Sequence, residues 1–212
     1  MKNVFIAIPC MDDMPFEFVK SLTRLQHVGQ TTINFNPGSL VYASRDYLAQ
    51  AAIAEKSDYI LWLDSDMVFN SDLLIDMVAS LEDGNKDIVT AVCFRRRPPF
   101  TPAIYKTIKM GFEGEDVTEA YDDYPNEPFE VDACGFACCL MKTEVAAHII
   151  FREKQCFAPI PGYGEDISFC IRAKKYGYKI WADPRIYVGH IARTVSDRAT
   201  FEAWRANNGG GK

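Results

Sequence analysis

Two aspartates separated by one residue are the strongest candidates for chemistry in this sequence. Asp64, Ser65 and Asp66 follow directly on the unbroken apolar run from Tyr59 to Leu63. Such a run is typical of a central strand covered on both faces, and ligands of open α/β sheets collect outside the carboxyl ends of the strands. Two carboxylates there can converge on a divalent cation, Mg²⁺ or Mn²⁺, completed by water and substrate phosphate. The alternative is a turn in which Asp64 caps its own backbone.

A second acidic pair, Glu165 and Asp166, follows a loop in which Gly162 and Gly164 flank Tyr163. Glycines around an aromatic residue suit a mobile lid over a site. A carboxylate delivered by such a loop can act as a general base toward an attacking hydroxyl. The competing interpretation is structural, because acidic side chains in the first turn of a helix are favoured by its dipole.

His190 is the candidate nitrogen ligand, because it closes a strand-like segment that begins at Ile186, whereas His27 and His148 lie in helical stretches. A histidine beside carboxylates would favour manganese. Three arginines at 95–97 also follow a strand-like segment, at 88–93. Guanidinium groups suit phosphate geometry, so these arginines can bind a donor phosphate or an anionic acceptor, or form a solvated surface cluster.

Cysteines and aromatic residues are more ambiguous. Seven cysteines at irregular spacing favour reduced thiols over a disulfide framework. Three of them lie in an apolar stretch without paired metal-ligand spacing, so we interpret them as buried small side chains rather than zinc ligands: Cys134, Cys138 and Cys139. Four aromatics could stack on a sugar or base, but core packing is predicted for most of them: Phe94, Phe100, Tyr105 and Trp181.

The elements that must position these residues alternate between strand-like and helix-like patterns. Strands are predicted at 4–8, 31–35, 59–63, 88–93, 103–108, 131–141, 179–181 and 186–188. Helices are predicted at 16–25, 41–55 and 165–176, with another that begins at a Ser71 cap and stops at Gly84. The stretch 111–130 is acidic and loop-rich. This alternation predicts an α/β fold with a mixed, mainly parallel central sheet flanked by helices.

Composition limits the class of protein. The chain has 212 residues, 48% of them hydrophobic and 25% charged, as expected for one globular domain. A net charge of -6 argues against stable nucleic-acid binding, which needs a basic face. The first apolar run ends at Pro9 before Asp12 and Asp13, unlike a signal peptide, and no run has membrane-spanning length. Together with the thiols, this predicts a cytoplasmic protein without a membrane span, and it leaves open whether the chain is a homo-oligomer.

The motifs, taken in order, resemble the GT-A glycosyltransferases, especially the compact family 2-like enzymes. The resemblance runs through IAIPC, LVYASRDYLAQAA, YILWLDSDMVF, VDACGFACCLMK, GYGEDISFCIRAKKYGYKIW and YVGH, and so covers most of the chain. It implies the Rossmann-like fold of nucleotide-diphospho-sugar transferases. We expect one such domain over 1–206 and a flexible tail over 207–212.

The same resemblance implies roles for individual residues. Pro9 would line the nucleoside pocket and Arg45 would approach the nucleotide. Of the Asp64-Ser65-Asp66 segment, Asp66 would be the principal metal ligand and Asp64 would lie nearer the ribose or donor sugar, with His190 completing the metal site. Gly135 and Phe136 would border the donor sugar and acceptor, Asp166 would be the base of an inverting reaction, and Glu165 would assist acceptor binding. One departure is Asp46, where asparagine is expected after Arg45.

The predicted function is therefore metal-dependent transfer of a sugar from a nucleotide-diphosphate sugar, by default a UDP-sugar, to an unknown acceptor hydroxyl. A nucleotidyltransferase or phosphohydrolase would also hold a metal with paired carboxylates. Related nucleotidyltransferases generally carry a glycine-rich, basic loop after the first strand, whereas residues 9–13 here are acidic and lack glycine. A module that binds nucleotide sugars without turnover is the third alternative.

Overall fold

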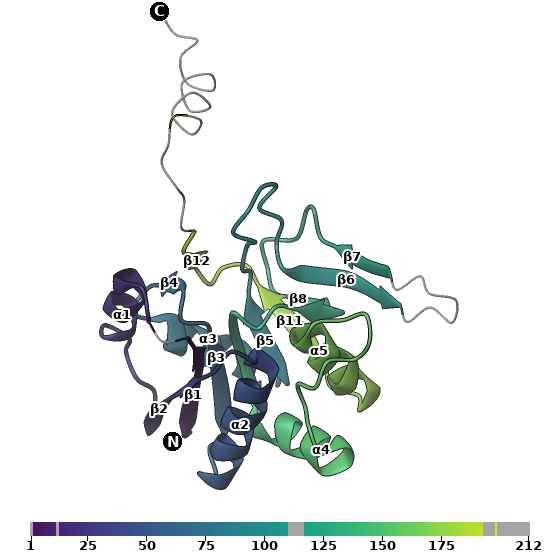
Figure 1. Ribbon diagram of the computed structural model, residues 1–212, viewed down its shortest axis with the longest axis horizontal. Coiled ribbons are helices and arrows are strands. Elements are labelled where there is room, and N and C mark those ends of the chain that lie inside the picture. The colour runs from purple at the N-terminus through teal and green to yellow at the C-terminus, as the bar shows by residue number, and fades with distance from the viewer. Residues whose placement is uncertain (1, 12, 110–116, 193–197, 199–212) are drawn as a thin grey trace, which may run out of the picture.

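The chain folds around one seven-stranded sheet. A computed structural model describes residues 2–11, 13–109, 117–192 and 198 (Figure 1). The helices are α1 (Phe16–Leu22), α2 (Val41–Ala54), α3 (Leu73–Glu82), α4 (Thr143–Glu153) and α5 (Glu165–Lys175). The strands are β1 (Val4–Cys10), β2 (Thr31–Pro37), β3 (Tyr59–Leu63), β4 (Met67–Phe69), β5 (Ile88–Ala91), β6 (Ile104–Lys109), β7 (Val117–Ala120), β8 (Phe129–Val131), β9 (Ala133–Cys134), β10 (Cys138–Lys142), β11 (Ile180–Asp183) and β12 (Val188–His190).

The sheet has the strand order β2-β1-β3-β10-β5-β11-β8. Strand β1 pairs in parallel with β2 and β3, and β5 pairs in parallel with β11. Strands β10 and β8 run antiparallel to their neighbours. The sheet is therefore mixed but mainly parallel, which confirms the predicted fold class, and the carboxyl ends of its five parallel strands share one edge.

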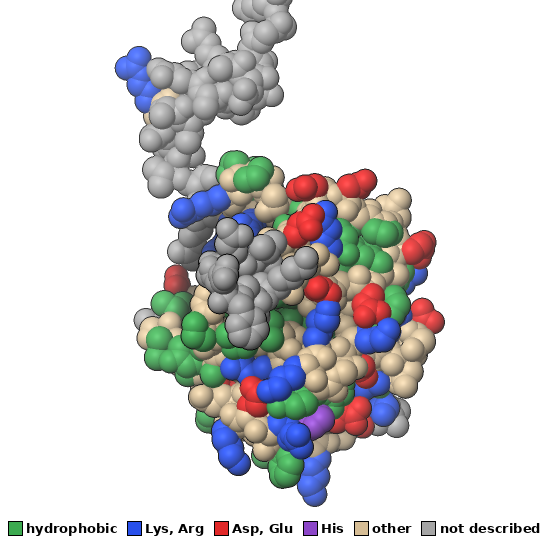
Figure 2. Space-filling model, turned by 90° about the vertical axis from the view of Figure 1, so that its right-hand side faces the viewer, with side chains coloured by type: hydrophobic (Ala, Val, Ile, Leu, Met, Phe, Trp, Pro, Cys, Tyr) green, Lys and Arg blue, Asp and Glu red, His purple; other side chains and the backbone are tan. Residues whose placement is uncertain are grey.

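Helices cover both faces of this sheet. Alternate residues of each central strand point to opposite faces, so each of these strands contributes to two core clusters. Phe5 and Trp62 pack with α2, α4 and α5 in one core cluster. Ile6 and Leu61 pack with α1 and α3 in the other. All five residues of β3 are buried, as the unbroken apolar run predicted. Figure 2 shows acidic and basic side chains interspersed on one outer face of the molecule.

Two smaller sheets lie beyond the parallel edge. One pairs β4 with β12, and the other has the order β7-β6-β9. The predicted strand at 131–141 is in fact three short strands, β8, β9 and β10, which belong to two different sheets. The acidic stretch 111–130, expected to be loop-rich, contains β7. Residues 111–116 of that stretch and the predicted tail at 207–212 lie outside the described residues.

Other differences concern element ends. Helix α1 stops at Leu22 rather than at residue 25, and β2 continues through Pro37 rather than ending at residue 35. Helix α3 has Asp72 at its N-cap position, without a side-chain capping bond, so the prediction of a Ser71 cap was wrong. Helix α4 contains His148, in agreement with the helical stretch predicted there without bounds, whereas His27 lies after α1 and outside any helix. No helix among the described residues combines the length and the apolar character needed to cross a membrane.

Candidate active site

Asp66 and His190 lie side by side at the carboxyl edge of the sheet. Asp66 follows β3, and the antiparallel pairing of β4 with β12 aligns His190 with Met67. A backbone bond from Ile191 N to Asp66 O, 2.8 Å long, continues that pairing. His190 Nε2 consequently lies 3.3 Å from Asp66 Oδ1. Residues more than 120 positions apart in sequence are thus held together by backbone structure rather than by side-chain contacts alone.

The ring of His190 is oriented by a second bond, between Nδ1 and the Phe94 carbonyl oxygen, at 2.9 Å. A carbonyl oxygen can only accept, so Nδ1 carries a proton and Nε2 is the atom that faces Asp66. Histidines that bind metals commonly donate their other ring nitrogen in this way. The hydrogen bond with Asp66 raises the pKa of His190, although partial burial opposes the shift.

Asp66 is shared between two neighbouring side chains, Arg96 and His190. Its Oδ2 accepts a hydrogen bond from Arg96 Nη1 at 2.8 Å, while its Oδ1 faces His190. Partial burial alone would raise the pKa of Asp66, but His190 and Arg96 outweigh it and lower that pKa. Arg96 is one of the three arginines at 95–97. The sequence did not indicate that any of them contacts Asp66.

Asp64 has a different partner. Its Oδ1 accepts from Arg45 Nη2 at 2.8 Å, and burial raises its pKa against the opposing effect of Arg45. Among the described residues, no three His, Cys, Asp or Glu side chains are grouped closely enough to hold a metal ion. The structure therefore does not bring Asp64, Asp66 and His190 together as one three-ligand set. Two of the three, Asp66 and His190, are adjacent.

Arg45 is almost completely buried, with 2% of its surface exposed. Its guanidinium carbon lies 5.7 to 5.8 Å from the ring centroids of Trp62, Phe136 and Phe157. Its Nε lies 3.7 Å from Glu165 Oε1. Arg45 thus connects Asp64, at the end of β3, with the first turn of α5, and the expectation that it approaches the nucleotide directly does not fit its burial.

The ring of Phe136 packs among other aromatic rings and is 1% exposed, and its place beside the donor sugar and acceptor stays a prediction. Only its backbone contributes near the site, where the carbonyl oxygen accepts from Arg45 Nη1 at 3.4 Å. Pro9 is also buried, at the end of β1, two residues before Met11.

Gly135 lies against Asp166. A Cβ atom placed on Gly135 would be 3.7 Å from Asp166 Oδ2 and 3.3 Å from the Cβ of Ala103. Asp166 stands in the first turn of α5, where its Oδ1 accepts from Ile167 N at 2.7 Å. Burial, and then the charge of Glu165, raise the pKa of Asp166. Asp166 is therefore a candidate acid or base, because carboxyl groups whose pKa is raised by burial are common at functional sites.

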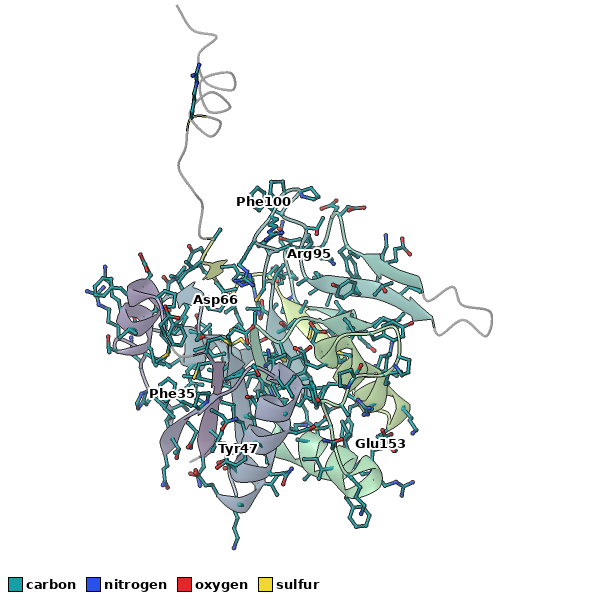
Figure 3. All side chains as sticks on the ribbon, in the orientation of Figure 1. Phe35, Tyr47, Asp66, Arg95, Phe100 and Glu153 are labelled. Carbon is teal, nitrogen blue, oxygen red and sulfur yellow. The ribbon has the colours of Figure 1, made fainter. Side chains whose placement is uncertain are left out.

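A cleft of about 760 Å³ opens in front of Asp66. Ser65 and Asp66 lie on one wall, and the loop of arginines lies on the other. Figure 3 shows Arg95 above Asp66, on the loop that rises from β5. The cleft is lined by Met11, Asp13, Pro15, Ser65, Asp66, Arg95, Arg96, Arg97, Pro98, Pro99, Ile191 and Ala192. It brings two carboxylates, Asp13 and Asp66, together with three arginines, and such a combination can bind a cation together with a phosphorylated ligand.

The cysteines take no part in this cleft. All seven lie in the described part of the chain and are thiols. Cys134, Cys138 and Cys139 are fully buried, which confirms their interpretation as small core side chains. Burial raises the pKa of the Cys138 thiol well above its ordinary value, so this thiol stays protonated and inert.

Asp46, where asparagine was expected, is a structural residue 4% exposed. Its Oδ1 accepts backbone bonds from Cys156 at 2.8 Å and Phe157 at 2.9 Å, which fix the segment after α4 against α2. Asparagine offers the same carbonyl acceptor.

We therefore expect Asp46→Asn to leave the free energy of unfolding nearly unchanged, whereas Asp46→Ala lowers it by about 3 kcal/mol, because two buried N–H groups lose their acceptor. Urea denaturation of both variants measures this difference. Equal destabilisation by the two substitutions would contradict this account of Asp46.

Comparisons with known proteins identify the family to which the chain belongs. The model of the family described as "Glycosyl transferase family 2" matches residues 33–149, more than half of the chain. A search of curated proteins found no match. The fold is similar to that in the crystal structure of A197 from STIV, with a TM-score of 0.57, 17% identity, and coverage of 91% of this chain and 87% of that one.

The fold is also similar to the crystal structure of GalNAc-T7 with UDP, GalNAc and Mn²⁺, with a TM-score of 0.61 and 11% identity. The match covers 91% of this chain but only 44% of that chain. At these identities the solved structures show the GT-A-like fold alone, and the family match carries the assignment. The chain belongs to glycosyl transferase family 2 and is a glycosyltransferase that acts with a nucleotide-sugar donor.

Proposed function

We propose that this chain transfers a sugar from a nucleotide-diphosphate sugar, with a UDP-sugar as the first donor to test, to an acceptor hydroxyl with inversion at the anomeric carbon. The observation that carries the proposal is Asp66, which lines a cleft together with Arg95, Arg96 and Arg97 and lies 3.3 Å from His190 Nε2. The UDP and Mn²⁺ in the crystal structure of GalNAc-T7 support the choice of base and metal.

The donor set fits a divalent cation of the Mg²⁺ or Mn²⁺ type. Asp66 offers a carboxylate oxygen, and His190 offers an Nε2 whose orientation is set by the Phe94 carbonyl. These cations are commonly held by one or two protein ligands, with substrate phosphates and water in the remaining positions. When bound, the cation would neutralise the negative charge that develops on the leaving diphosphate.

The other residues would bind the donor and move the proton. The arginines at 95–97 would pair with the diphosphate from the opposite wall. Arg45 would act as a positioning residue, because it holds Asp64 and Glu165 from beneath the site. Asp166 would take the proton from the acceptor hydroxyl as that oxygen attacks the anomeric carbon, and the bond to the diphosphate oxygen breaks on the opposite face. Glu165 would help to orient the acceptor.

A panel of nucleotide sugars incubated with Mn²⁺ tests the proposal, with release of nucleoside diphosphate as the signal. We expect a UDP-sugar to give the fastest release, and NMR of the product to show an inverted anomeric linkage. A retained linkage would exclude Asp166 as the direct base. Binding of the nucleotide, seen as a thermal shift, without any diphosphate release would contradict the proposed metal-dependent transfer.

Arg96 is expected to compete with the metal for Asp66. Its guanidinium occupies Oδ2 at 2.8 Å, and it is half-exposed, so the pair contributes at most about 1 kcal/mol. Arg96→Ala should therefore bind Mn²⁺ alone up to about fivefold more tightly, yet bind UDP with Mn²⁺ more weakly, because a phosphate partner is lost. Calorimetry measures both affinities. Arg97→Ala is the control for net charge, and equal gains of Mn²⁺ affinity in both variants would refute a specific role of Arg96.

The pH dependence of kcat/KM should report Asp166. A base must be deprotonated, so kcat/KM rises with pH through the pKa of Asp166, which burial and Glu165 hold above the ordinary aspartate value. Glu165→Gln removes the neighbouring charge, so the midpoint of this rise should move to lower pH. The profile is measured at saturating Mn²⁺. An unchanged or higher midpoint in Glu165→Gln would show that another group controls the acidic limb.

A further inference from the structure

A second cavity lies on the other side of the loop that carries the arginines. Its volume is about 620 Å³, and Pro99 lines both this cavity and the donor cleft. One wall is the loop between β5 and β6, and the other is the segment after β7. Its lining is Phe94, Pro99, Phe100, Thr101, Pro102, Asp122, Asp123, Tyr124 and Asn126. Of these residues, the proposed donor site uses only the Phe94 carbonyl, which orients His190, and Pro99, which also lines the donor cleft.

The cavity exposes aromatic rings that the sequence assigned to the core. Phe100 is 54% exposed and Phe94 is 40% exposed. Figure 3 shows Phe100 at the outer end of the loop, farther from the sheet than Arg95. Tyr124, on the facing wall, stacks on Phe129 with ring centroids 6.3 Å apart and an interplanar angle of 15°. Rings exposed to water in a concave site favour a ligand with an apolar face.

The loop presents Phe100 in a defined conformation. Phe100 has a φ of 54°, a left-handed backbone conformation that is uncommon for an aromatic residue. Backbone bonds close the loop on itself, from Phe100 N to Arg97 O at 2.9 Å and from Arg95 N to Thr101 O at 3.0 Å. Backbone strain of this kind clusters at ligand sites, where the surrounding structure maintains it.

The polar groups of the cavity are acidic or neutral. Asp122, Asp123 and Asn126 lie on the wall opposite the loop and are exposed. Carboxylates accept strong hydrogen bonds from hydroxyl groups, and they repel phosphates. The donor cleft, by contrast, carries Arg95, Arg96 and Arg97. The loop therefore separates a cleft that attracts an anionic ligand from a cavity that repels one.

We propose that this cavity binds the acceptor as a neutral saccharide, whose C–H face stacks on Phe100 and Phe94 and whose hydroxyls donate to Asp122 and Asp123. The proposal rests on the proposed function, because it identifies the acceptor class of the same reaction. The base of the loop connects the two sites. At one end of the loop, the Phe94 carbonyl oxygen accepts a hydrogen bond from His190 Nδ1 at 2.9 Å. At the other end, Ala103 lies beside Gly135, which borders Asp166.

The first test measures binding of the full chain to an array of neutral hexose and N-acetylhexosamine oligosaccharides. The array also includes a peptide rich in lysine and arginine, because the acidic and aromatic side chains of the cavity could attract such a peptide instead. We expect at least one neutral oligosaccharide to bind and the peptide not to bind. An array without a bound neutral sugar, or binding of the basic peptide alone, overturns the proposal.

The second test measures the affinity of the oligosaccharide that the array selects. Phe100→Ala should weaken it about tenfold, the scale expected for losing one aromatic stack, and Asp122→Asn with Asp123→Asn should weaken it through the hydroxyl contacts. Phe151→Ala is the matched control, because Phe151 is 77% exposed on α4 and lines neither cavity. Equal sugar affinity in Phe100→Ala and Phe151→Ala contradicts the proposal.

Binding of UDP with Mn²⁺, measured by calorimetry on the same variants, separates the two claims. We expect it to be unchanged in Phe100→Ala. If UDP binds but no neutral sugar does, the acceptor assignment fails and the donor site stands. If the sugar binds in a Phe100-dependent manner but UDP with Mn²⁺ does not bind, the proposed donor fails and the saccharide site stands.

Discussion

Asp166→Asn is expected to reduce kcat by about a thousandfold, within the range that a positioned general base contributes. Asparagine keeps the shape of the side chain and the acceptor for Ile167 N, which Asp166 Oδ1 bonds at 2.7 Å, but it cannot take a proton. Binding of UDP with Mn²⁺ should be unchanged, since Asp166 does not line the donor cleft. Steady-state kinetics and calorimetry on the same preparation measure both effects.

Glu144→Gln is the matched control for this variant. Glu144 also stands in the first turn of a helix, α4, and it is exposed. If first-turn carboxylates matter here only through the helix dipole, the two substitutions should change stability by similar small amounts and leave kcat alone. A kcat for Asp166→Asn within a factor of three of the Glu144→Gln value would remove Asp166 from the mechanism.

Asp66→Asn is also expected to reduce activity strongly, through the metal rather than through proton transfer. A neutral amide is a weaker ligand for a divalent cation and no longer opposes the charge of Arg96. We expect Mn²⁺ binding in the presence of UDP to weaken by about a hundredfold or more, with a comparable loss of kcat/KM at fixed metal concentration. Titration of activity with Mn²⁺ measures this, because excess metal should restore part of the rate.

Ser65→Ala serves as the control within the same turn. Ser65 lines the cleft, but a hydroxyl is not needed for the metal on this account. A loss of Mn²⁺ affinity in Ser65→Ala as large as that in Asp66→Asn would mean that the turn itself, rather than the Asp66 carboxylate, holds the ion. A stable Asp66→Asn protein with normal Mn²⁺ affinity would contradict the proposed ligand.

The central strands could be predicted from the sequence because a strand that is buried on both faces consists of consecutive apolar residues. An unbroken apolar run such as 59–63 fits a strand with helices on both sides, and the structure buries all five residues. The segment 131–141 is also apolar apart from Asp132, but there the chain changes sheets twice, between β8, β9 and β10. Hydrophobicity shows that such residues are buried, and it does not show which neighbour they pair with.

Site chemistry was predictable where it depends on residue type, and not where it depends on packing. The pairing of β4 with β12 places His190 beside Asp66, two residues that the sequence had singled out by type and by position after strands. Arg45 could not be judged in the same way. It is buried on a helix whose inward face also carries Ser44 and Asp46, so periodicity of apolar residues gives no sign that it points inward.

The most direct test of the site is pulsed electron paramagnetic resonance of Mn²⁺ bound with UDP to protein labelled with ¹⁵N at histidine. We propose that His190 Nε2 and Asp66 hold one cation. The spectrum should therefore show coupling of Mn²⁺ both to a histidine ¹⁵N nucleus and to phosphorus. The variant His190→Gln should lose the coupling to nitrogen and keep the coupling to phosphorus. A bound Mn²⁺ coupled to phosphorus but to no histidine nitrogen in the unsubstituted protein would contradict this proposal.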